Sequence, residues 1–205
     1  MLPQAESQWS FRSLCLKTNM IILASKSPRR KELLKGICPS FSIEAADIDE
    51  EASYILPPLE AVQDIAYRKG IKVAKLFPND VVISADTIVT IDGLIIGKPK
   101  DKDDAKRLLK LLSGRTHKVI TAYSIICKDL LIRNYVVSEV IFENLTDDII
   151  DAYIATGSPM DKAGAYGVQD NDKNHIIKSF SGSYSNIMGF PVDEIKSDLI
   201  KNRLI

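Results

Sequence analysis

The sequence predicts an α/β protein that folds as one domain, and three observations support this prediction. A continuous apolar run at residues 20–24 is typical of a strand buried on both faces, and a helix signal follows it directly. Residues 58–77 repeat apolar side chains at helical spacing. Residues 118–127 and 131–142 are rich in β-branched and apolar residues on either side of a tight turn, which predicts two long antiparallel strands.

Length and composition limit the number of domains, the partners and the cellular location that we expect. A chain of 205 residues is long enough for one substantial core. Basic and acidic side chains balance at 27 each, so no overall field attracts nucleic acid or an anionic membrane, and we expect neither as a partner. No apolar run approaches the roughly 20 residues that a membrane span needs. The three cysteines show no CxxC spacing, which argues against a disulfide framework or structural zinc and favours a cytoplasmic location.

The first residues stand apart from the rest. Residues 1–19 contain Arg12 and Lys17 but also Glu6, and they lack the apolar segment of a secretory signal. We expect residues 1–19 to be an N-terminal extension, disordered or left over from expression. Met20 would then be the natural start, and residues 20–205 the single domain.

A strand-to-helix corner at residues 20–34 predicts an anion site. Ser27 is a good N-cap, and Pro28 suits the first position of a helix that we expect to end at Lys35. The amino end of this helix carries free N–H groups and the positive end of the helix dipole, and Arg29 and Arg30 add fixed positive charge. A phosphate would be stabilised there. The alternative is two arginines that merely face solvent.

An acidic loop follows a second short strand, which we expect at Phe41–Ala45. The loop contains Asp47, Asp49, Glu50 and Glu51. One of these carboxylates would be a metal ligand if it pointed back at the phosphate site, because magnesium takes oxygen ligands and usually only one or two protein carboxylates. The alternative is a solvated loop. The long amphipathic helix at residues 58–77 comes next, and we expect it to end before Pro78.

The most hydrophobic strand, residues 81–91, is interrupted by polar side chains. These are Ser84, Asp86 and Thr87. A carboxylate costs several kcal/mol to bury unpaired, so Asp86 needs a metal, a cation or an open cleft. We favour the cleft. The alternative is an aspartate at a bend that bonds nearby backbone N–H groups.

The dipeptide Asp92-Gly93 predicts a hairpin that returns the chain to Lys98. This hairpin would bring Lys98 back toward Asp86, and a cation facing that aspartate would suit a site that handles phosphate. The alternative is an ordinary lysine at a strand end. Three further helices are expected: one capped by Asp101, which looks structural, one starting at Thr146 and one at residues 192–204.

Residues 157–170 are too rich in glycine for a core element, and their glycines would let backbone come close to a ligand. Lys162 would bind phosphate. The amide of Gln169 can pair with the edge of a base through one donor and one acceptor. The alternative is a surface loop with turn residues. Residues 181–191 form a second polar, glycine-bearing loop.

Six motifs taken together resemble the Maf family of nucleoside triphosphate pyrophosphatases. In chain order they are LASKSPRRKELL (23–34), SADTIV (84–89), GKP (97–99), LSGRTHKVIT (112–121), DKAGAYGVQ (161–169) and GSYSNIMGFP (182–191). The resemblance covers nearly everything from residue 20 onward. It implies an α/β fold with an elongated mixed central sheet flanked by helices, and two lobes with an active-site cleft, similar to the inosine triphosphate pyrophosphatases.

The resemblance also implies a reaction. The family hydrolyses nucleoside triphosphates between the α- and β-phosphates, giving a monophosphate and pyrophosphate, with Mg²⁺ or Mn²⁺ as cofactor. By position, Asp86 and Lys98 would be catalytic, with Asp86 the presumed base, and Glu50 and Asp86 would handle metal and water. The residues that would surround the phosphates are Ser27, Arg29, Arg30, Lys69, Lys98 and Lys162.

The loop that begins at residue 161 resembles the branch of the family that acts on dTTP and UTP rather than on 7-methyl-GTP. Arg29, Thr87 and Gln169 match the specificity positions of that branch. Two positions depart from its pattern, because Ser158 stands where an acidic residue is expected and Asp170 where the branch often has glycine. Whether CTP or modified pyrimidine nucleotides are also substrates stays open.

The resemblance implies a homodimer, and it leaves a second function open. The family is linked to septum formation, so the alternative is a nucleotide-binding regulatory protein of cell division. Asp86 separates the two hypotheses, because a pure sensor could do without it, and here it is present together with Glu50 and Lys98.

Overall fold

The structure is a computed structural model that describes residues 19–205. The predicted extension therefore lies, apart from Asn19, outside the described residues. A mixed seven-stranded sheet forms the centre, with strands in the order β2-β1-β3-β5-β6-β7 and β4 paired to β3 beside this row. The strands are β1 (Ile21–Leu23), β2 (Ser42–Ile43), β3 (Val81–Ile91), β4 (Leu94–Ile96), β5 (Thr116–Cys127), β6 (Leu130–Phe142) and β7 (Ile177–Ser181).

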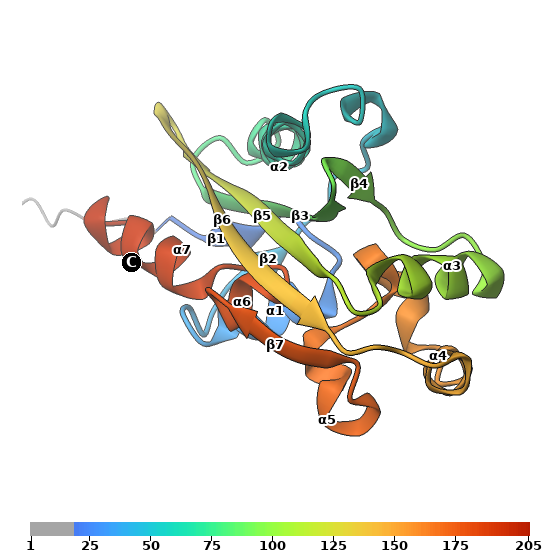
Figure 1. Cartoon of the computed structure of the whole chain (residues 1–205). Coiled ribbons are helices and arrows are strands. Elements are labelled where there is room, and N and C mark those ends of the chain that lie inside the picture. Colours follow the sequence, from blue (N-terminus) through green and yellow to red (C-terminus); the bar gives the residue numbers. More distant parts are fainter. Residues whose placement is uncertain (1–18) are drawn as a thin grey trace, which may run out of the picture.

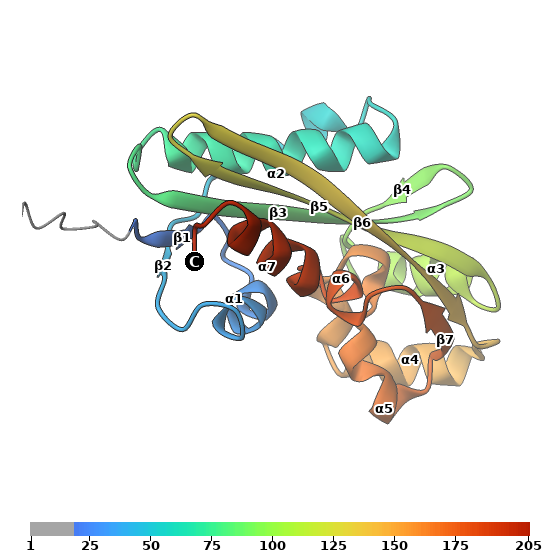
Figure 2. The same cartoon turned by 90° about the vertical axis from the view of Figure 1, so that its left-hand side faces the viewer.

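Helices cover both faces of the sheet. They are α1 (Pro28–Lys35), α2 (Pro58–Ala74), α3 (Lys102–Leu112), α4 (Asp147–Ala155), α5 (Asn171–Asn174), α6 (Tyr184–Ile187) and α7 (Val192–Lys201). Helix α2 lies on one face, whereas α1, α6 and α7 lie on the other, and α3, α4 and α5 gather near one end of the long strands (Figures 1 and 2). Within residues 19–205, every helix is too short or too polar to span a lipid bilayer.

Strand β3 has three partners, and their arrangement leaves a gap. Along one edge, β5 pairs antiparallel with residues 82–90 of β3. Along the other edge, β1 pairs parallel with residues 81–83, and β4 pairs antiparallel with residues 89–91. Among the described residues, no strand pairs with this second edge between those two segments. Asp86 and Thr87 lie in the gap.

Among the described residues the buried apolar side chains form four clusters, of which two smaller ones pack α2 on the sheet and the two largest form two lobes around the long strands. One lobe packs α1 and α7 against β1 and β3, through residues that include Leu23, Leu34, Ile83, Phe190, Ile195 and Leu199. The other lobe packs α3, α4 and the segment before β7 together, through residues that include Leu108, Leu109, Phe142, Tyr153, Ala165 and Val168. The α/β class, the elongated mixed sheet and the two lobes agree with the prediction.

Local sequence signals place several element ends. The hydroxyl of Ser27 accepts the N–H of Arg30 at the start of α1, which runs over the predicted residues. Asp101 caps α3 and Thr146 caps α4 in the same way. The predicted hairpin at Asp92-Gly93 is present, and both of its residues have positive φ, at 51° and 77°, as a type I′ turn requires.

The stretch at residues 157–170 departs from the prediction. It forms three short 3₁₀ turns, at Ser158–Asp161, Ala163–Ala165 and Val168–Asp170. Ala165 and Val168 are buried in the core, so the expectation that the whole stretch stays out of the core was wrong. Gly164 adopts a φ of 72°, which turns the chain so that the apolar side chains after it face inward.

Other differences concern element ends and short elements. The strand expected at residues 41–45 is only Ser42–Ile43, the helix expected at 58–77 ends at Ala74, and the last helix ends at Lys201 rather than Leu204. Strand β7 and helices α5 and α6 were not predicted. Strand β7 is exposed at four of its five residues and shows no alternation of apolar and polar side chains, which is the signal that predicts a half-buried strand.

Candidate active site

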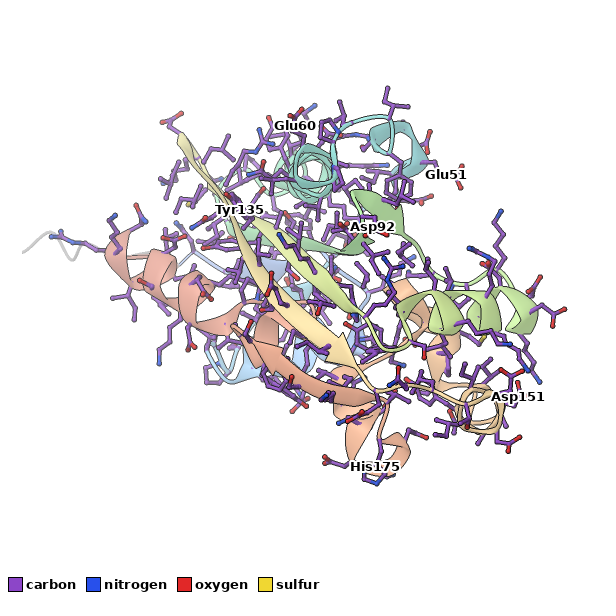
Figure 3. The ribbon with its side chains drawn as sticks, in the orientation of Figure 1. Glu51, Glu60, Asp92, Tyr135, Asp151 and His175 are labelled. Atoms are coloured by element: carbon purple, nitrogen blue, oxygen red, sulfur yellow. The ribbon has the colours of Figure 1, made fainter. Side chains whose placement is uncertain are left out.

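A pocket of about 570 Å³ lies at the gap along β3, between the two lobes. Its volume falls in the range of small-molecule sites. Glu51, which also lines the pocket, is labelled in Figure 3 on the turn that precedes α2. All the residues predicted to act line this one pocket: Ser27, Arg29, Arg30, Glu50, Lys69, Asp86, Thr87, Lys98, Lys162 and Gln169.

Lys69 joins the two carboxylates that were predicted to handle metal and water. Its Nζ atom lies 2.8 Å from Oδ1 of Asp86 and 2.7 Å from Oε1 of Glu50. Helix α2 supplies the lysine and β3 supplies Asp86, whose side chain is buried. Lys98 reaches the same pocket, but the ammonium group that contacts Asp86 is that of Lys69. Lys98 makes no ion pair within residues 19–205.

Burial changes the proton affinity of Asp86. Desolvation raises the pKa of Asp86 above its ordinary value, and the positive charges of Lys69 and Arg30 act in the opposite direction. Asp86 is therefore a more basic carboxylate than an exposed aspartate, and it is held beside a cation. Such a group is suited to accept a proton from water. Its partner is an ammonium group rather than the backbone N–H groups of the alternative reading.

The carboxylates of Glu50 and Asp86 fit a divalent cation. Lys69 contacts one oxygen of each, which leaves the second oxygen of each available. Within the described residues, no group of three or more His, Cys, Asp and Glu side chains converges. Two protein carboxylates are nevertheless the usual number for magnesium, because substrate phosphates and water complete its shell.

The guanidinium group of Arg30 is hydrogen-bonded to backbone carbonyl groups. Its Nη1 atom donates to the carbonyl of Ala85 at 2.7 Å and its Nε atom to the carbonyl of Gly189 at 2.8 Å. Ala85 lies on the edge of β3 that faces the gap, so the guanidinium takes the place of a strand partner. Desolvation lowers the pKa of Arg30, while Asp86 opposes this shift. Arg30 thus adds positive charge to the pocket and also holds α1 against β3.

The direction of the hydrogen bonds around Thr87 can be assigned. The Thr121 hydroxyl donates its only proton to the carbonyl of Asn186 at 3.0 Å. The 3.0 Å contact between Thr87 and Thr121 must therefore have Thr87 as its donor, and Arg30 donates to Thr87 at 3.1 Å. The Thr87 hydroxyl has one lone pair left, so it can offer a ligand only an acceptor. Sequence reasoning missed Thr121, because a buried hydroxyl within a strand gives no separate signal.

Asp161 bridges two of the predicted phosphate ligands. Its Oδ2 atom accepts from Arg29 at 2.9 Å, and its Oδ1 atom accepts from Lys162 at 2.8 Å. Partial burial acts to raise the pKa of Asp161, but the hydrogen bonds from Lys162 and Arg29 outweigh it and hold that pKa below its ordinary value. The carboxylate thus holds together a cation from α1 and a cation from the loop at residues 157–170. Substrate phosphates would compete with it for both.

Gln169 lines the pocket with its side chain folded over Gly167. A Cβ atom added to Gly167 would lie 2.5 Å from Nε2 of Gln169 and 2.8 Å from Cε of Lys162. The glycine therefore makes room for two predicted substrate-binding side chains. No hydrogen bond within the described residues fixes the Gln169 amide, so either orientation is open to a ligand.

The two positions that depart from the family pattern are in contact. The Ser158 hydroxyl donates to Oδ2 of Asp170 at 2.7 Å. Lys162, the neighbouring cation, donates to Ser158 and lies 3.8 Å from the same oxygen. The acidic charge that Ser158 lacks is thus supplied by Asp170, from the other end of the loop.

Comparison with solved structures first defines the class of the fold. The structure superposes on the Ham1 protein of Staphylococcus aureus with a TM-score of 0.52 at 16% sequence identity, covering 90% of this chain and 100% of that one. It superposes on a HAM1 protein from Coxiella burnetii with a TM-score of 0.50 at 13% identity, covering 89% and 99%. The predicted α/β fold is confirmed, and these likenesses show the fold alone.

Sequence comparison then identifies the family. The model of the Maf family, described as Maf-like protein, matches residues 20–202. Curated relatives named dTTP/UTP pyrophosphatase include one from Clostridium botulinum, 44% identical over 183 residues, which cover 87% of this chain and 97% of the relative. Another, from Fusobacterium nucleatum, is 45% identical over 183 residues, covering 88% and 94%. The chain belongs to the Maf-like family.

Proposed function

We propose that the chain is a nucleoside triphosphate pyrophosphatase that hydrolyses dTTP and UTP to the monophosphate and pyrophosphate. The observation that carries this proposal is the buried Asp86, bonded to Lys69 in a pocket that also gathers Arg29, Lys98 and Lys162. The pocket offers a base and the cations that a triphosphate requires. Relatives at 44% and 45% identity bear the name dTTP/UTP pyrophosphatase, which supports the choice of substrate.

In the proposed reaction, the carboxylate of Asp86 accepts a proton from water while the water oxygen attacks the α-phosphorus. A new P–O bond forms, the bond from the α-phosphorus to the α–β bridging oxygen breaks, and pyrophosphate leaves with the electron pair. Lys69 supports the base, because its positive charge opposes the effect of burial and favours the ionised form. The cations of the pocket offset the charge on the phosphoryl oxygens.

Glu50 and Asp86 would hold Mg²⁺ or Mn²⁺ through their second oxygens. Bound there, the ion would supply positive charge to the phosphate oxygens of the substrate. Hard oxygen ligands suit these ions, and the pocket lining contains no histidine or cysteine that would favour zinc.

Selection of the nucleobase would depend on Gln169 and Thr87. Gln169 offers one donor and one acceptor, which match the O4 and N3–H edge that thymine and uracil share. Thr87 offers only a lone pair, so it favours a ligand group that donates. Cytosine presents an amino group in place of O4, so CTP fits only if the Gln169 amide turns over. No hydrogen bond in the described structure prevents that rotation.

Two further proposals rest on the sequence and the family resemblance. The protein would be a homodimer, and it would work in the cytoplasm, where cysteines stay reduced. Light scattering coupled to size-exclusion chromatography tests the dimer, which predicts about twice the mass of the 22.8 kDa chain. The alternative function, a nucleotide-binding regulator of septum formation, does not require the Asp86–Lys69 pair, and the names of the relatives favour the hydrolase.

A phosphate assay with added pyrophosphatase, run over a panel of nucleoside triphosphates, tests the proposed function. We expect phosphate to appear only when the pyrophosphatase is present, and dTTP and UTP to be used well ahead of purine triphosphates. Phosphate release without the added enzyme would mean cleavage at the γ-phosphate. Tight binding of dTTP without turnover would favour the regulatory protein.

A further inference from the structure

Five residues in and beside the loop at residues 157–170 form a continuous set of hydrogen bonds, which we term the Asp170 cluster. Its members are Tyr153, Ser158, Lys162, Gly167 and Asp170. Oδ2 of Asp170 accepts from the Tyr153 hydroxyl at 2.8 Å and from the Ser158 hydroxyl at 2.7 Å. The Tyr153 hydroxyl in turn accepts the backbone N–H of Gly167 at 3.1 Å, and the Ser158 hydroxyl accepts from Lys162 at 3.0 Å.

The charge of Asp170 fixes the direction of its bonds to the two hydroxyls, whereas Lys162 and the Gly167 N–H can only donate. An ionised carboxylate only accepts, so both hydroxyl protons must point at Asp170. The lone pairs of Tyr153 and Ser158 are then directed at Gly167 and Lys162. Burial raises the pKa of Tyr153, as does its bond to Asp170, so this hydroxyl stays a donor at neutral pH.

The cluster has two branches, and each ends at a different part of the proposed substrate site. One branch runs from Asp170 through Ser158 to the ammonium group of Lys162, which lines the pocket and is predicted to bind phosphate. The other runs through Tyr153 to the backbone of Gly167, the residue over which the Gln169 side chain is folded. A single carboxylate is therefore connected to both groups.

We propose that Asp170 is a positioning residue that sets Lys162 for the phosphates through Ser158 and sets Gln169 for the base through Tyr153. The identity of the ligands that Lys162 and Gln169 bind rests on the proposed function, whereas the hydrogen bonds of the two branches are observed in the structure. Because the branches diverge at Asp170, phosphate binding and base selection are separable by single substitutions.

The test removes each branch in turn and uses two readouts. Binding of inorganic pyrophosphate, measured by calorimetry, reports on Lys162 without a base or turnover. The ratio of kcat/KM for dTTP to that for dGTP reports on base selection. Circular dichroism melting checks that each variant folds. Asp172→Ala serves as the matched control, because Asp172 is an exposed carboxylate two residues along the chain with no ion pair among the described residues.

Ser158→Ala is expected to raise the Kd for pyrophosphate about fivefold to tenfold, the net worth of one ordinary hydrogen bond, because the Ser158 carbonyl and Asp161 still hold Lys162, and to leave the selectivity ratio unchanged. Tyr153→Phe is expected to leave pyrophosphate binding unchanged and to lower the selectivity ratio by a similar factor. Asp170→Ala should produce both losses, and Asp172→Ala neither.

Moving the carboxylate from residue 170 to residue 158 tests the two branches separately. The double variant Ser158→Asp with Asp170→Gly restores a negative charge beside Lys162 but gives Tyr153 no acceptor. We expect it to recover pyrophosphate affinity relative to Asp170→Gly alone, while its selectivity ratio stays low. A merely structural role for Asp170 would not divide the two readouts in this way.

Three outcomes would overturn the inference: wild-type pyrophosphate affinity in Ser158→Ala, full selectivity in Tyr153→Phe, or equal losses in both readouts for both variants. If Tyr153→Phe does not fold, Asp170→Gly takes its place, and full selectivity in that variant would overturn the inference. A wild-type protein that hydrolyses none of the triphosphates would contradict the proposed function instead. The pyrophosphate readout would still test the branch to Lys162.

Discussion

The pocket has two unlike sides. The strand side is built on regular elements, with Asp86 on β3 and Lys69 on α2. The loop side is built on the 3₁₀ turns of residues 158–170, which carry Lys162 and Gln169. Side chains on helices and strands are held more rigidly than those on loops. If the proposed roles hold, the chemical step rests on regular elements, whereas nucleobase selection combines Thr87 on β3 with Gln169 on the more variable loop side.

The two sides also have opposite charge arrangements. On the strand side, the cation Lys69 lies between the carboxylates of Glu50 and Asp86. On the loop side, the carboxylate of Asp161 lies between the cations of Arg29 and Lys162. A metal ion held by the second oxygens of Glu50 and Asp86 would share these carboxylates with Lys69, whereas a phosphate would compete with Asp161 for its cations. The strand side thus presents a pair of carboxylates and the loop side a pair of cations.

The largest effect is expected from Asp86→Asn, which keeps the size of the side chain and removes its charge. The strand side should then lose the base, so turnover of dTTP should fall by ~10²–10⁴-fold, the usual worth of such a group. Nucleotide binding and the melting temperature should stay close to wild type. The matched control is Glu60→Gln on the outer surface of α2 (Figure 3), which should leave turnover unchanged. Near-wild-type hydrolysis by Asp86→Asn would show that Asp86 is not the general base.

Removal of metal should have the next largest effect. If Glu50 and Asp86 share a hard cation, hydrolysis should stop in EDTA and return with Mg²⁺ or Mn²⁺ in excess. The measurement is the dTTP hydrolysis rate during a metal titration of the chelated protein. Full activity in EDTA would mean that Lys69 and the other cations of the pocket stabilise the charge without metal.

A smaller and more selective effect is expected on the loop side. Gln169→Ala should lower kcat/KM for dTTP and UTP by ~1–3 kcal/mol, the worth of one or two hydrogen bonds, with far less effect on purine triphosphates. The measurement is kcat/KM for dTTP, UTP, CTP, dGTP and ATP in both proteins. A uniform loss across all five substrates, or a wild-type preference for purines, would show that Gln169 does not read the base.

The smallest expected effect is a shift in pH dependence. A carboxylate accepts a proton only when ionised, so if Asp86 is the base, kcat/KM should fall as the pH drops through the pKa of Asp86. Because burial raises this pKa, the fall should begin at a higher pH than for an exposed aspartate, whose pKa is about 3.9. Lys69→Ala removes the cation that opposes the shift, and the acid limb of the pH–rate profile should move further up. If the acid limb does not move, Lys69 does not influence the pKa of Asp86.

The strand side could be predicted from the sequence because its signals are local. The apolar run of β3 and the Ser27-Pro28 helix start gave the right bounds for β3 and α1. The contact between Lys69 and Asp86 could not be predicted, because it depends on how α2 packs on the sheet. Likewise, the bridge made by Asp161 and the contact between Ser158 and Asp170 join segments whose mutual placement no periodicity encodes.

The most direct test of the account is the position of an oxygen label. Hydrolysis of dTTP in H₂¹⁸O, followed by mass spectrometry of both products, identifies the phosphorus that water attacks. With Asp86 directing water at the α-phosphorus, the label should appear in dTMP and be absent from pyrophosphate. Label in pyrophosphate, or dTDP and phosphate as the products, would contradict attack of water on the α-phosphorus.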